Sequence, residues 1–180
     1  MHTNITLITS NKNKVLEYER LLGIKLNYRK IDLPEPQTTD VSDVAKIKAI
    51  RAYELIGQAC LVDDTGLTIH AWGELPGALI RWFEDNVGNE GILKMLGTNT
   101  LRNATVATAL GYCDENGVKV FVGKVEGLIA DLPRGSNGFG YDSIFIPDGQ
   151  SKTFAEMTDA EKDIFSMRAR ATQAMIDKLL

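Results

Sequence analysis

Hydrophobic residues along the chain recur with two different periods, which predicts an alternation of strands and helices. Runs of consecutive apolar residues predict buried strands at 5–8, 26–31 and 59–62. Apolar residues three or four positions apart predict one helix from Asn13 to a stop at Gly23, and another over 42–56. The first third of the chain is therefore expected to run strand, helix, strand, helix, strand.

The rest of the chain continues this mixture and adds one long hairpin. Two acids before Thr-Gly predict a tight turn at 63–66, and Pro76-Gly77 predicts another. The β-rich stretches 105–113 and 118–129 are joined by Asp-Glu-Asn-Gly, a strong hairpin signal. Helical spacing predicts helices at 80–86 and 91–96 and a largely helical end at 159–180.

No repeat, low-complexity tract or linker divides the sequence, so residues 1–180 are expected to form a single domain. Helices interspersed with strands indicate an α/β domain with a mixed sheet. A chain of 180 residues with 44% hydrophobic content is long enough to bury one sizeable core.

The charge balance narrows the class of partner. Acids (24) outnumber lysines plus arginines (20), which gives a net charge of −4. Proteins that coat nucleic acids are usually basic, so we expect no nucleic-acid partner, whereas a small anionic ligand remains open. No stretch approaches the roughly 20 apolar residues of a membrane helix, and no signal peptide is visible. We therefore expect no membrane partner and a cytoplasmic protein, whose Cys60 and Cys113 are reduced, buried thiols.

The segment Thr9-Ser10-Asn11-Lys12-Asn13-Lys14 lies between a predicted strand and a predicted helix. Backbone N–H groups at a helix start, short polar side chains and a nearby lysine can hold a phosphate. The spaced glycines of a P-loop are absent. The alternative is an ordinary capped helix with solvated lysines.

Three acids in the first half, Glu35, Asp63 and Asp64, are candidates for a metal site. Adjacent carboxylates at the end of an apolar strand are costly unless a cation or a proton compensates them. Oxygen ligands suit Mg²⁺, which commonly also bridges to substrate phosphates. The alternative is that Asp63 and Asp64 only cap the predicted Thr65-Gly66 turn.

The segment Gly138-Phe139-Gly140-Tyr141-Asp142 combines glycines, aromatic rings and an acid. Glycines let a backbone approach a ligand closely, either ring can stack on a base, and Asp142 can accept hydrogen bonds. Lys162 and Arg168 follow on a predicted helix, where they share a face only if the helix breaks near Phe165-Ser166. The alternative is a glycine-rich turn followed by a helix with solvated charges.

The sequence contains no recognisable set of residues for catalysis by a protein nucleophile. The only histidines are His2 and His70, and His70 alternates with apolar neighbours in a predicted strand. No Ser-His-Asp set, zinc site or dinucleotide-binding glycine fingerprint can be assembled. Metal-activated water is therefore favoured.

Taken in order, these segments resemble the inosine triphosphate pyrophosphatase family, also called XTP/dITP diphosphatases. The similarity rests on Ser-Asn-x-x-Lys, Asp-Asp-Thr-Gly-Leu with a downstream Leu-Pro-Gly, Gly-Phe-Gly-Tyr-Asp, Thr-Phe-Ala-Glu-Met and Ser-x-Arg. It implies an elongated mixed sheet with flanking helices and a central nucleotide-binding cleft, usually in a homodimer. It also implies Mg²⁺-dependent hydrolysis of ITP, dITP and XTP to the nucleoside monophosphate and pyrophosphate.

The resemblance implies roles for residues at matching positions. Asp64 would be the general base with Asp63 supporting it, and Glu35 and Asp64 would hold Mg²⁺. The remaining matches would bind the nucleoside triphosphate: Thr9, Ser10, Asn11, Lys14, Lys48, Thr65, Arg81, Phe139, Gly140, Tyr141, Asp142, Lys162, Met167 and Arg168.

One position departs from the family, which normally has Ser-His-Arg where this chain has Ser166-Met167-Arg168. In the family, this histidine helps to recognise the 6-oxo edge of the purine, whereas methionine has no hydrogen-bond donor. A lost donor in a buried site costs about 1–3 kcal/mol, which is enough to shift the base preference. The alternative is that Arg168 or backbone groups supply the contact.

Two other function classes remain. One is a non-catalytic nucleotide-binding or sensing protein, although a mere binder would not need the costly acids Glu35, Asp63 and Asp64. The other is a phosphatase that releases single phosphates, which differs in its product.

Overall fold

A seven-stranded mixed sheet runs through the computed structural model, which describes residues 5–179. The strand order is β2-β1-β3-β5-β6-β7, with β4 paired to β3. β1 pairs in parallel with β2 and β3, and the other pairs are antiparallel. The strands are β1 (Thr6–Ile8), β2 (Asn27–Arg29), β3 (Cys60–Ile69), β4 (Pro76–Gly77), β5 (Asn103–Asp114), β6 (Gly117–Ile129) and β7 (Phe145–Pro147). The predicted mixed sheet and the long hairpin are both confirmed.

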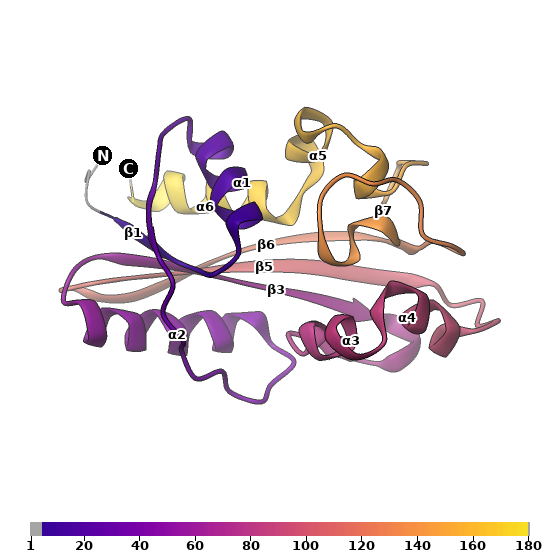
Figure 1. Ribbon diagram of the computed structural model, residues 1–180, viewed down its shortest axis with the longest axis horizontal. Helices are drawn as coiled ribbons and strands as arrows, with labels where there is room; N and C mark the ends of the chain where they lie inside the picture. Colours follow the sequence, from indigo (N-terminus) through magenta and orange to yellow (C-terminus); the bar gives the residue numbers. More distant parts are fainter. Residues whose placement is uncertain (1–4, 180) are drawn as a thin grey trace.

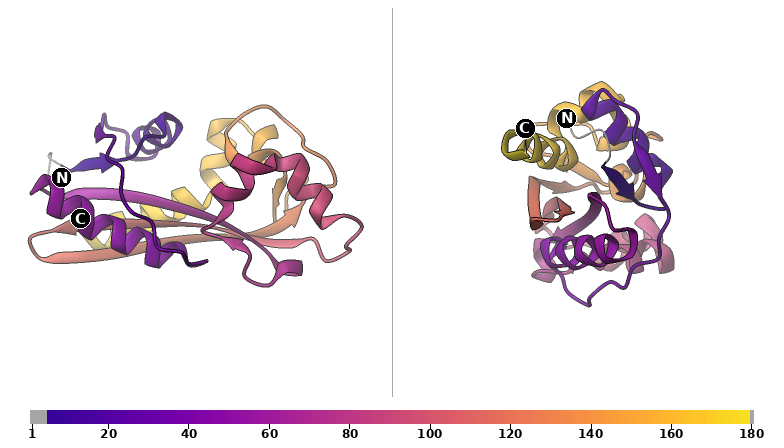
Figure 2. Two further views of the ribbon diagram at one scale, coloured as in Figure 1. Left: turned by 60° about the horizontal axis from the view of Figure 1, so that its bottom comes forward. Right: turned by 90° about the vertical axis from the view of Figure 1, so that its left-hand side faces the viewer.

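Helices cover both faces of this sheet. α2 lies on one face and α1 and α6 lie on the other, and the long β3, β5 and β6 give the molecule its elongated shape (Figures 1 and 2). The helices are α1 (Lys12–Leu22), α2 (Val41–Ile56), α3 (Ile80–Asn86), α4 (Gly88–Leu96), α5 (Asp159–Phe165) and α6 (Met167–Leu179), with 3₁₀ turns η1 (His70–Trp72), η2 (Gly140–Ser143) and η3 (Phe154–Glu156). Within residues 5–179, no helix has the length and apolar character needed to cross a membrane.

Two glycines let the helices lie close to the sheet. A Cβ on Gly111 of β5 would be 2.4 Å from the backbone oxygen of Ala45 in α2. A Cβ on Gly123 of β6 would be 2.0 Å from the backbone oxygen of Met167 in α6. Because neither backbone oxygen is the end of a flexible side chain, larger residues at these positions would push the helices away from the sheet.

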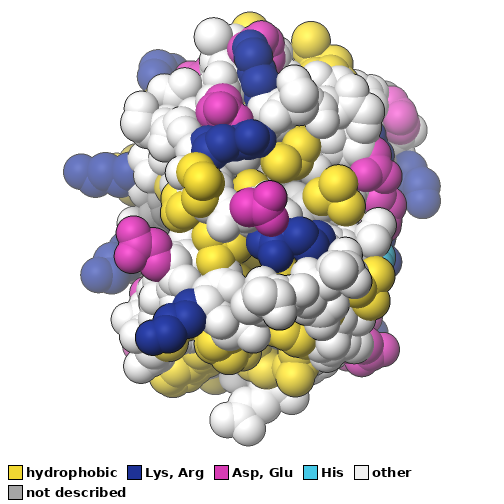
Figure 3. Space-filling view, turned by 90° about the vertical axis from the view of Figure 1, so that its right-hand side faces the viewer, with side chains coloured by type: hydrophobic (Ala, Val, Ile, Leu, Met, Phe, Trp, Pro, Cys, Tyr) yellow, Lys and Arg dark blue, Asp and Glu magenta, His cyan; other side chains and the backbone are white. Residues whose placement is uncertain are grey.

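A separate apolar cluster holds together the end of the molecule that contains α3, α4 and β7, which is called the far end below. Ile80 of α3 and Ile92 of α4 pack there with Phe145, Phe154 and Met167. Figure 3 shows this end, where basic, acidic and hydrophobic side chains are interspersed and do not form one continuous basic surface. This apolar cluster thus anchors α3 and the loop before η2 at the far end.

Three local predictions are wrong. Residues 63–66 do not form a turn but lie inside β3, where Asp63 and Asp64 are opposite Leu110 and Ala109 of β5. The ladder to β5 carries the strand through, because cations from neighbouring helices compensate the two acids. Pro76-Gly77 forms the short strand β4, and His70 lies in η1, not in a strand.

The break predicted near Phe165-Ser166 is confirmed. α5 ends at Phe165 and α6 begins at Met167, with Ser166 in an extended conformation between them. The Ser166 hydroxyl accepts a hydrogen bond from the Ala169 N–H at 3.1 Å, which caps the new helix. The last turn of α5 and the first turn of α6 can therefore face the same site.

Candidate functional site

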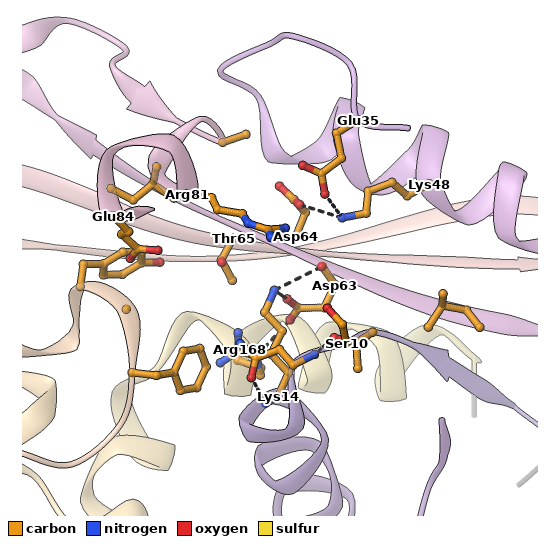
Figure 4. Close-up of a pocket in the computed structure, with 18 of the residues that line it drawn as sticks. Ser10, Lys14, Glu35, Lys48, Asp63, Asp64, Thr65, Arg81, Glu84 and Arg168 are labelled. Atoms are coloured by element: carbon orange, nitrogen blue, oxygen red, sulfur yellow. Dashed lines mark hydrogen bonds and ion pairs between the residues drawn. The ribbon is translucent and has the colours of Figure 1, made fainter. Parts of the chain in front are cut away.

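A cleft of about 520 Å³ lies between β3, the start of α1, α2, α3 and the loop before η2 (Figure 4). Segments far apart in sequence meet there. Every residue predicted for the site lines it: Thr9, Ser10, Asn11, Lys14, Glu35, Lys48, Asp63, Asp64, Thr65, Arg81, Phe139, Gly140, Tyr141, Asp142, Lys162, Met167 and Arg168. The structure thus brings together all the predicted positions, while their chemical roles remain predictions.

Asp63 and Asp64 point to opposite faces of β3, because successive residues of a strand alternate. Asp63 faces α1 and α6, where it accepts a hydrogen bond from the Tyr18 hydroxyl and pairs with Lys14. Asp64 faces α2, where its Oδ1 lies 3.3 Å from the Lys48 Nζ. Figure 4 shows the two carboxylates directed to these different lysines.

Asp63 is a permanently charged anchor. Besides Lys14 and Tyr18, it accepts a 3.0 Å hydrogen bond from the Arg168 Nε. Burial alone would raise the pKa of Asp63, but the charges of Arg168 and Lys14 hold it well below its usual value. A carboxylate so fully engaged positions its cationic partners and is poorly suited to accept a proton.

Asp64 has the opposite character. Burial raises its pKa to about 6, against the opposing charges of Lys48 and Lys14. Its Oδ2 is buried and accepts no hydrogen bond from the residues that the structure describes. This oxygen is therefore available to a water, a metal ion or a substrate group.

The two carboxylates predicted to bind metal are bridged by one lysine. Lys48 Nζ lies 2.6 Å from the Glu35 Oε1 and 3.3 Å from the Asp64 Oδ1. Residues 5–179 contain no group of three or more His, Cys, Asp or Glu side chains placed to hold a metal. Glu35 and Asp64 are two carboxylates, and an ion such as Mg²⁺ commonly takes few protein ligands and shares its remaining positions with water and phosphates, so Mg²⁺ binding here stays a prediction.

The start of α1 presents polar groups to the cleft. Asn11 caps the helix by accepting hydrogen bonds from the N–H groups of Asn13 and Lys14 at 2.9 and 3.4 Å. The Thr9 hydroxyl accepts the Asn11 N–H at 3.1 Å. Asn11 therefore acts as a helix cap, as the alternative interpretation predicts. Lys14 is not solvated, because it pairs with Asp63 and is only 15% exposed, and phosphate binding by this segment stays a prediction.

The loop before η2 is closed by Asp142. Its Oδ2 accepts the Phe139 N–H at 2.8 Å and pairs with Lys162 Nζ at 2.7 Å. Gly138 has φ +73°, and a Cβ there would be 2.1 Å from the same oxygen. Asp142 thus shapes the loop from within through its Oδ2, while its contact with a base or sugar stays a prediction.

Lys162 and Arg168 converge on a residue that the sequence did not single out, Glu17. Lys162 Nζ lies 2.8 Å from the Glu17 Oε1, and Arg168 pairs with the Glu17 Oε2. The charges of Arg168 and Lys162 lower the pKa of Glu17 despite its burial, which by itself would raise it. The Arg168 Nη2 is buried with no hydrogen-bond partner among residues 5–179, so it retains a donor for a ligand.

Of the two aromatic rings in the loop, Phe139 is the one placed to stack on a ligand. Tyr141 is buried and donates its hydroxyl to the Gly66 carbonyl at 3.2 Å, which ties the loop to β3. Phe139 is half-buried at the cleft, with Lys162 Nζ 5.2 Å and Arg168 Cζ 5.5 Å from its ring centroid. Met167 borders the cleft but is 3% exposed and belongs to the apolar cluster of the far end.

Five polar residues of the site were not predicted from the sequence: Asp32, Glu84 and Asp85 line the cleft, and Glu17 and Tyr18 bind its charged residues. A signal existed for Glu17, because it is an acid beside the apolar positions Val15 and Tyr18 of α1, where burial demands a partner. Tyr18 fitted the apolar stripe of that helix and gave no sign that its hydroxyl binds Asp63. Glu84 belongs to a polar stretch of α3 typical of a solvated helix and gave no signal.

Comparison with known proteins agrees with the motifs. The profile of the Ham1 family matches residues 5–178. The chain is 39% identical to inosine triphosphate pyrophosphatase 2 of Trypanosoma cruzi over 95% of its own length and 89% of that protein. It is also 39% identical to the dITP/XTP pyrophosphatase of Methanopyrus kandleri, covering 94% and 92% of the two chains.

Solved structures show the same fold. A HAM1 protein from Coxiella burnetii superposes with a TM-score of 0.85 at 30% identity, over 97% of both chains. The Ham1 protein of Staphylococcus aureus superposes with a TM-score of 0.81 at 26% identity, over 98% of both chains. Because the profile match runs from the first strand to the last helix and includes every segment that lines the cleft, this chain belongs to the Ham1 family.

Proposed function

We propose that this protein hydrolyses non-standard purine nucleoside triphosphates (ITP, dITP and XTP) to the nucleoside monophosphate and pyrophosphate, and that it needs Mg²⁺. One observation carries the proposal. A single cleft combines Lys14 and Lys48, the poised carboxylate of Asp64 and, beyond them, the ring of Phe139. The names of the relatives support this substrate class.

The lysines and Asp64 divide the work at the phosphate end. A triphosphate carries about four negative charges, which Lys14 and Lys48 partly neutralise on binding and as charge grows on the leaving pyrophosphate. Asp64 Oδ2 takes one proton from the attacking water. The water oxygen bonds to the α-phosphorus, and the bond from this phosphorus to the bridging oxygen breaks, so pyrophosphate leaves with the electron pair.

Mg²⁺ fits the residues present. The Asp64 Oδ2 is buried without a partner, and Glu35 and Asp64 already face one cation, the ammonium of Lys48. When bound, the ion supplies positive charge to the phosphate oxygens and to the attacking water. Arrival of Mg²⁺ and substrate would move the Lys48 ammonium from the carboxylates toward a phosphate oxygen.

The nucleoside end favours a shifted base preference within this function. Met167 offers no donor and is held in an apolar cluster, so the 6-oxo group of the purine depends on the free Nη2 of Arg168. Discrimination between ITP or XTP, which carry a 6-oxo group, and ATP, which carries a 6-amino group, is therefore expected to be weaker than a histidine at this position would give.

Assembly and location complete the proposal. We include a homodimer, which rests on the family resemblance alone, and a cytoplasmic location, which rests on the sequence alone. Sedimentation at several protein concentrations tests the first, and imaging of the tagged protein in cells tests the second.

Product analysis tests the proposal. The protein is incubated with Mg²⁺ and ITP, XTP, dITP, GTP, ATP or dUTP, and pyrophosphate and single phosphate are measured separately. We expect pyrophosphate and monophosphate in equal amounts, with the purines that carry a 6-oxo group preferred. Binding without turnover would indicate a nucleotide sensor, and release of single phosphates would indicate a phosphatase.

A further inference from the structure

Glu84 places an unused carboxylate oxygen in the cleft. It lies on α3 and lines the cleft on the side of the loop that carries Phe139 and Gly140 (Figure 4). Its Oε1 is buried and makes no hydrogen bond of ordinary geometry to residues 5–179, although the Tyr141 N–H lies close enough to the carboxylate to lower its pKa. A buried acceptor without a donor is costly, and in a ligand-binding cleft the ligand is the natural source of that donor.

The surrounding backbone is built to accommodate this side chain. Gly140 has φ +62°, and a Cβ there would be 2.8 Å from the Glu84 Oε1. Asn89 of α4 donates hydrogen bonds of 2.9 Å to the Gly140 carbonyl and to the Ser143 hydroxyl. Asn89 of α4 therefore binds this segment and holds it against Glu84 of α3, which gives the carboxylate a defined position.

The negative charges at and around Glu84 disfavour binding of the triphosphate beside it. Burial first, then Asp85 and Asp142, raise its pKa to about 7, whereas Lys14 and the Tyr141 N–H act in the opposite direction. A phosphate beside this carboxylate would be repelled, while Lys14 and Lys48 attract it at the other end. Glu35, Asp63 and Asp64 are each paired with a lysine, whereas Glu84 forms no ion pair among residues 5–179, so Glu84 is better suited to the nucleoside than to the phosphates.

We infer that Glu84 is a specificity-determining residue whose free Oε1 accepts a hydrogen bond from an N–H or O–H donor of the bound nucleoside. The inference rests on the proposed function for the identity of the ligand. Two donors distinguish otherwise similar substrates: the 2-amino group, present in guanine and absent from hypoxanthine, and the ribose 2′-hydroxyl, absent from deoxynucleotides. Met167 cannot form such a hydrogen bond with the nucleoside. Glu84 therefore determines which substrates are preferred, according to whether they carry the donor that it recognises.

Four substrates separate the two donors. The values of kcat/KM for ITP, GTP, dITP and dGTP are compared in the wild type, Glu84→Gln and Glu84→Leu. Glu90→Gln is the control, an exposed acid on α4 that does not line the cleft. Because a hydrogen bond to a charged group is lost, Glu84→Leu should lower kcat/KM for the recognised substrates at least about tenfold more than for the others, with Glu84→Gln intermediate.

The pattern of loss identifies the donor. Loss confined to GTP and dGTP assigns the 2-amino group, and loss confined to ITP and GTP assigns the 2′-hydroxyl. An equal change for all four substrates, or none, in an active enzyme overturns the inference and leaves the proposed function intact.

Binding of the monophosphates keeps the inference independent of turnover. Calorimetry with IMP, GMP, dIMP and dGMP should show the same pattern of weakened binding in the Glu84 variants. If no triphosphate yields pyrophosphate but this pattern appears, the proposed reaction fails and the role of Glu84 stands. If no triphosphate yields pyrophosphate and the wild type binds none of the four monophosphates, both fail.

Discussion

At the residue scale, two neighbouring aspartates have opposite properties because a strand alternates its side chains. Arg168 and Lys14 hold Asp63 charged, whereas burial raises the pKa of Asp64 to about 6 in spite of its ion pair with Lys48. The family resemblance assigned the two acids different roles, but nothing in the sequence itself gave a physical reason for the difference. The sequence pattern predicted a turn at this point, and a turn does not impose strict alternation between two faces.

Asp64→Asn should abolish turnover and preserve the fold. An amide cannot take the proton from water, and loss of a general base costs about a hundredfold or more in kcat. Steady-state kinetics with ITP and circular dichroism measure the two effects. Asp148→Asn, an exposed acid away from the cleft, should retain the wild-type rate. Near-normal turnover in Asp64→Asn would remove this residue from the role of base.

Met167→His should raise the preference for ITP and XTP, which carry a 6-oxo group, over ATP, which carries a 6-amino group. The imidazole returns a donor next to Arg168, at a position that borders the cleft. We expect the ratio of kcat/KM values for ITP and ATP to rise about tenfold, as one additional hydrogen bond allows. Met95→His, at an exposed position on α4, is the control. An unchanged ratio would show that Met167 does not influence base selection.

At the element scale, the break between α5 and α6 makes the nucleoside end possible. Lys162 in the last turn of one helix and Arg168 in the first turn of the next meet at Glu17 of α1. The need for a break could be predicted from the spacing of the two cations. Their common acid could not be, because it comes from a helix at the other end of the chain and no local pattern links them.

Glu17→Gln should destabilise the protein by about 2–4 kcal/mol, because it leaves two buried cations with one partner fewer. The pKa of Glu17 is lowered in the folded state from its ordinary value of 4.5. Its carboxylate therefore stabilises the fold above about pH 4.5, and this contribution is lost as the pH falls through the lowered pKa.

Denaturant titrations at several pH values check both parts of this prediction. The free energy of unfolding of the wild type should fall on acidification below about pH 4.5, and that of Glu17→Gln should fall less. Glu19→Gln is the matched control, since its partner Lys25 is 90% exposed, and its loss of stability should be much smaller. Equal losses in the two variants would show that the Glu17 network does not stabilise the fold.

At the scale of the whole molecule, the cleft joins the two halves of the chain. The phosphate end comes from β1, α1, α2 and β3, and the nucleoside end comes from α3, the loop before η2 and the last two helices. The fold class, the long hairpin and the set of lining residues could be predicted, because they depend on periodicity and on motifs. The place of Glu84 in the cleft could not be predicted, because it depends on the packing of α3 and α4 against the segment that contains Gly140.

Removal of Mg²⁺ should abolish turnover and leave the fold unchanged. Only two acids and a lysine form the predicted metal site, so the ion does not hold the structure together. Chelation with EDTA should stop pyrophosphate release, added Mg²⁺ should restore it, and the melting temperature should stay within a few degrees. Full activity in the presence of EDTA would exclude the proposed metal dependence.

The central claim is that water attacks the α-phosphorus of the substrate and releases intact pyrophosphate. Hydrolysis of ITP in water enriched in heavy oxygen tests it directly, because the labelled atom remains on the phosphorus that was attacked. The account predicts one heavy oxygen in IMP and none in pyrophosphate, as mass spectrometry of both products would show. Label in pyrophosphate or in single phosphate would place the attack on another phosphorus and contradict the account.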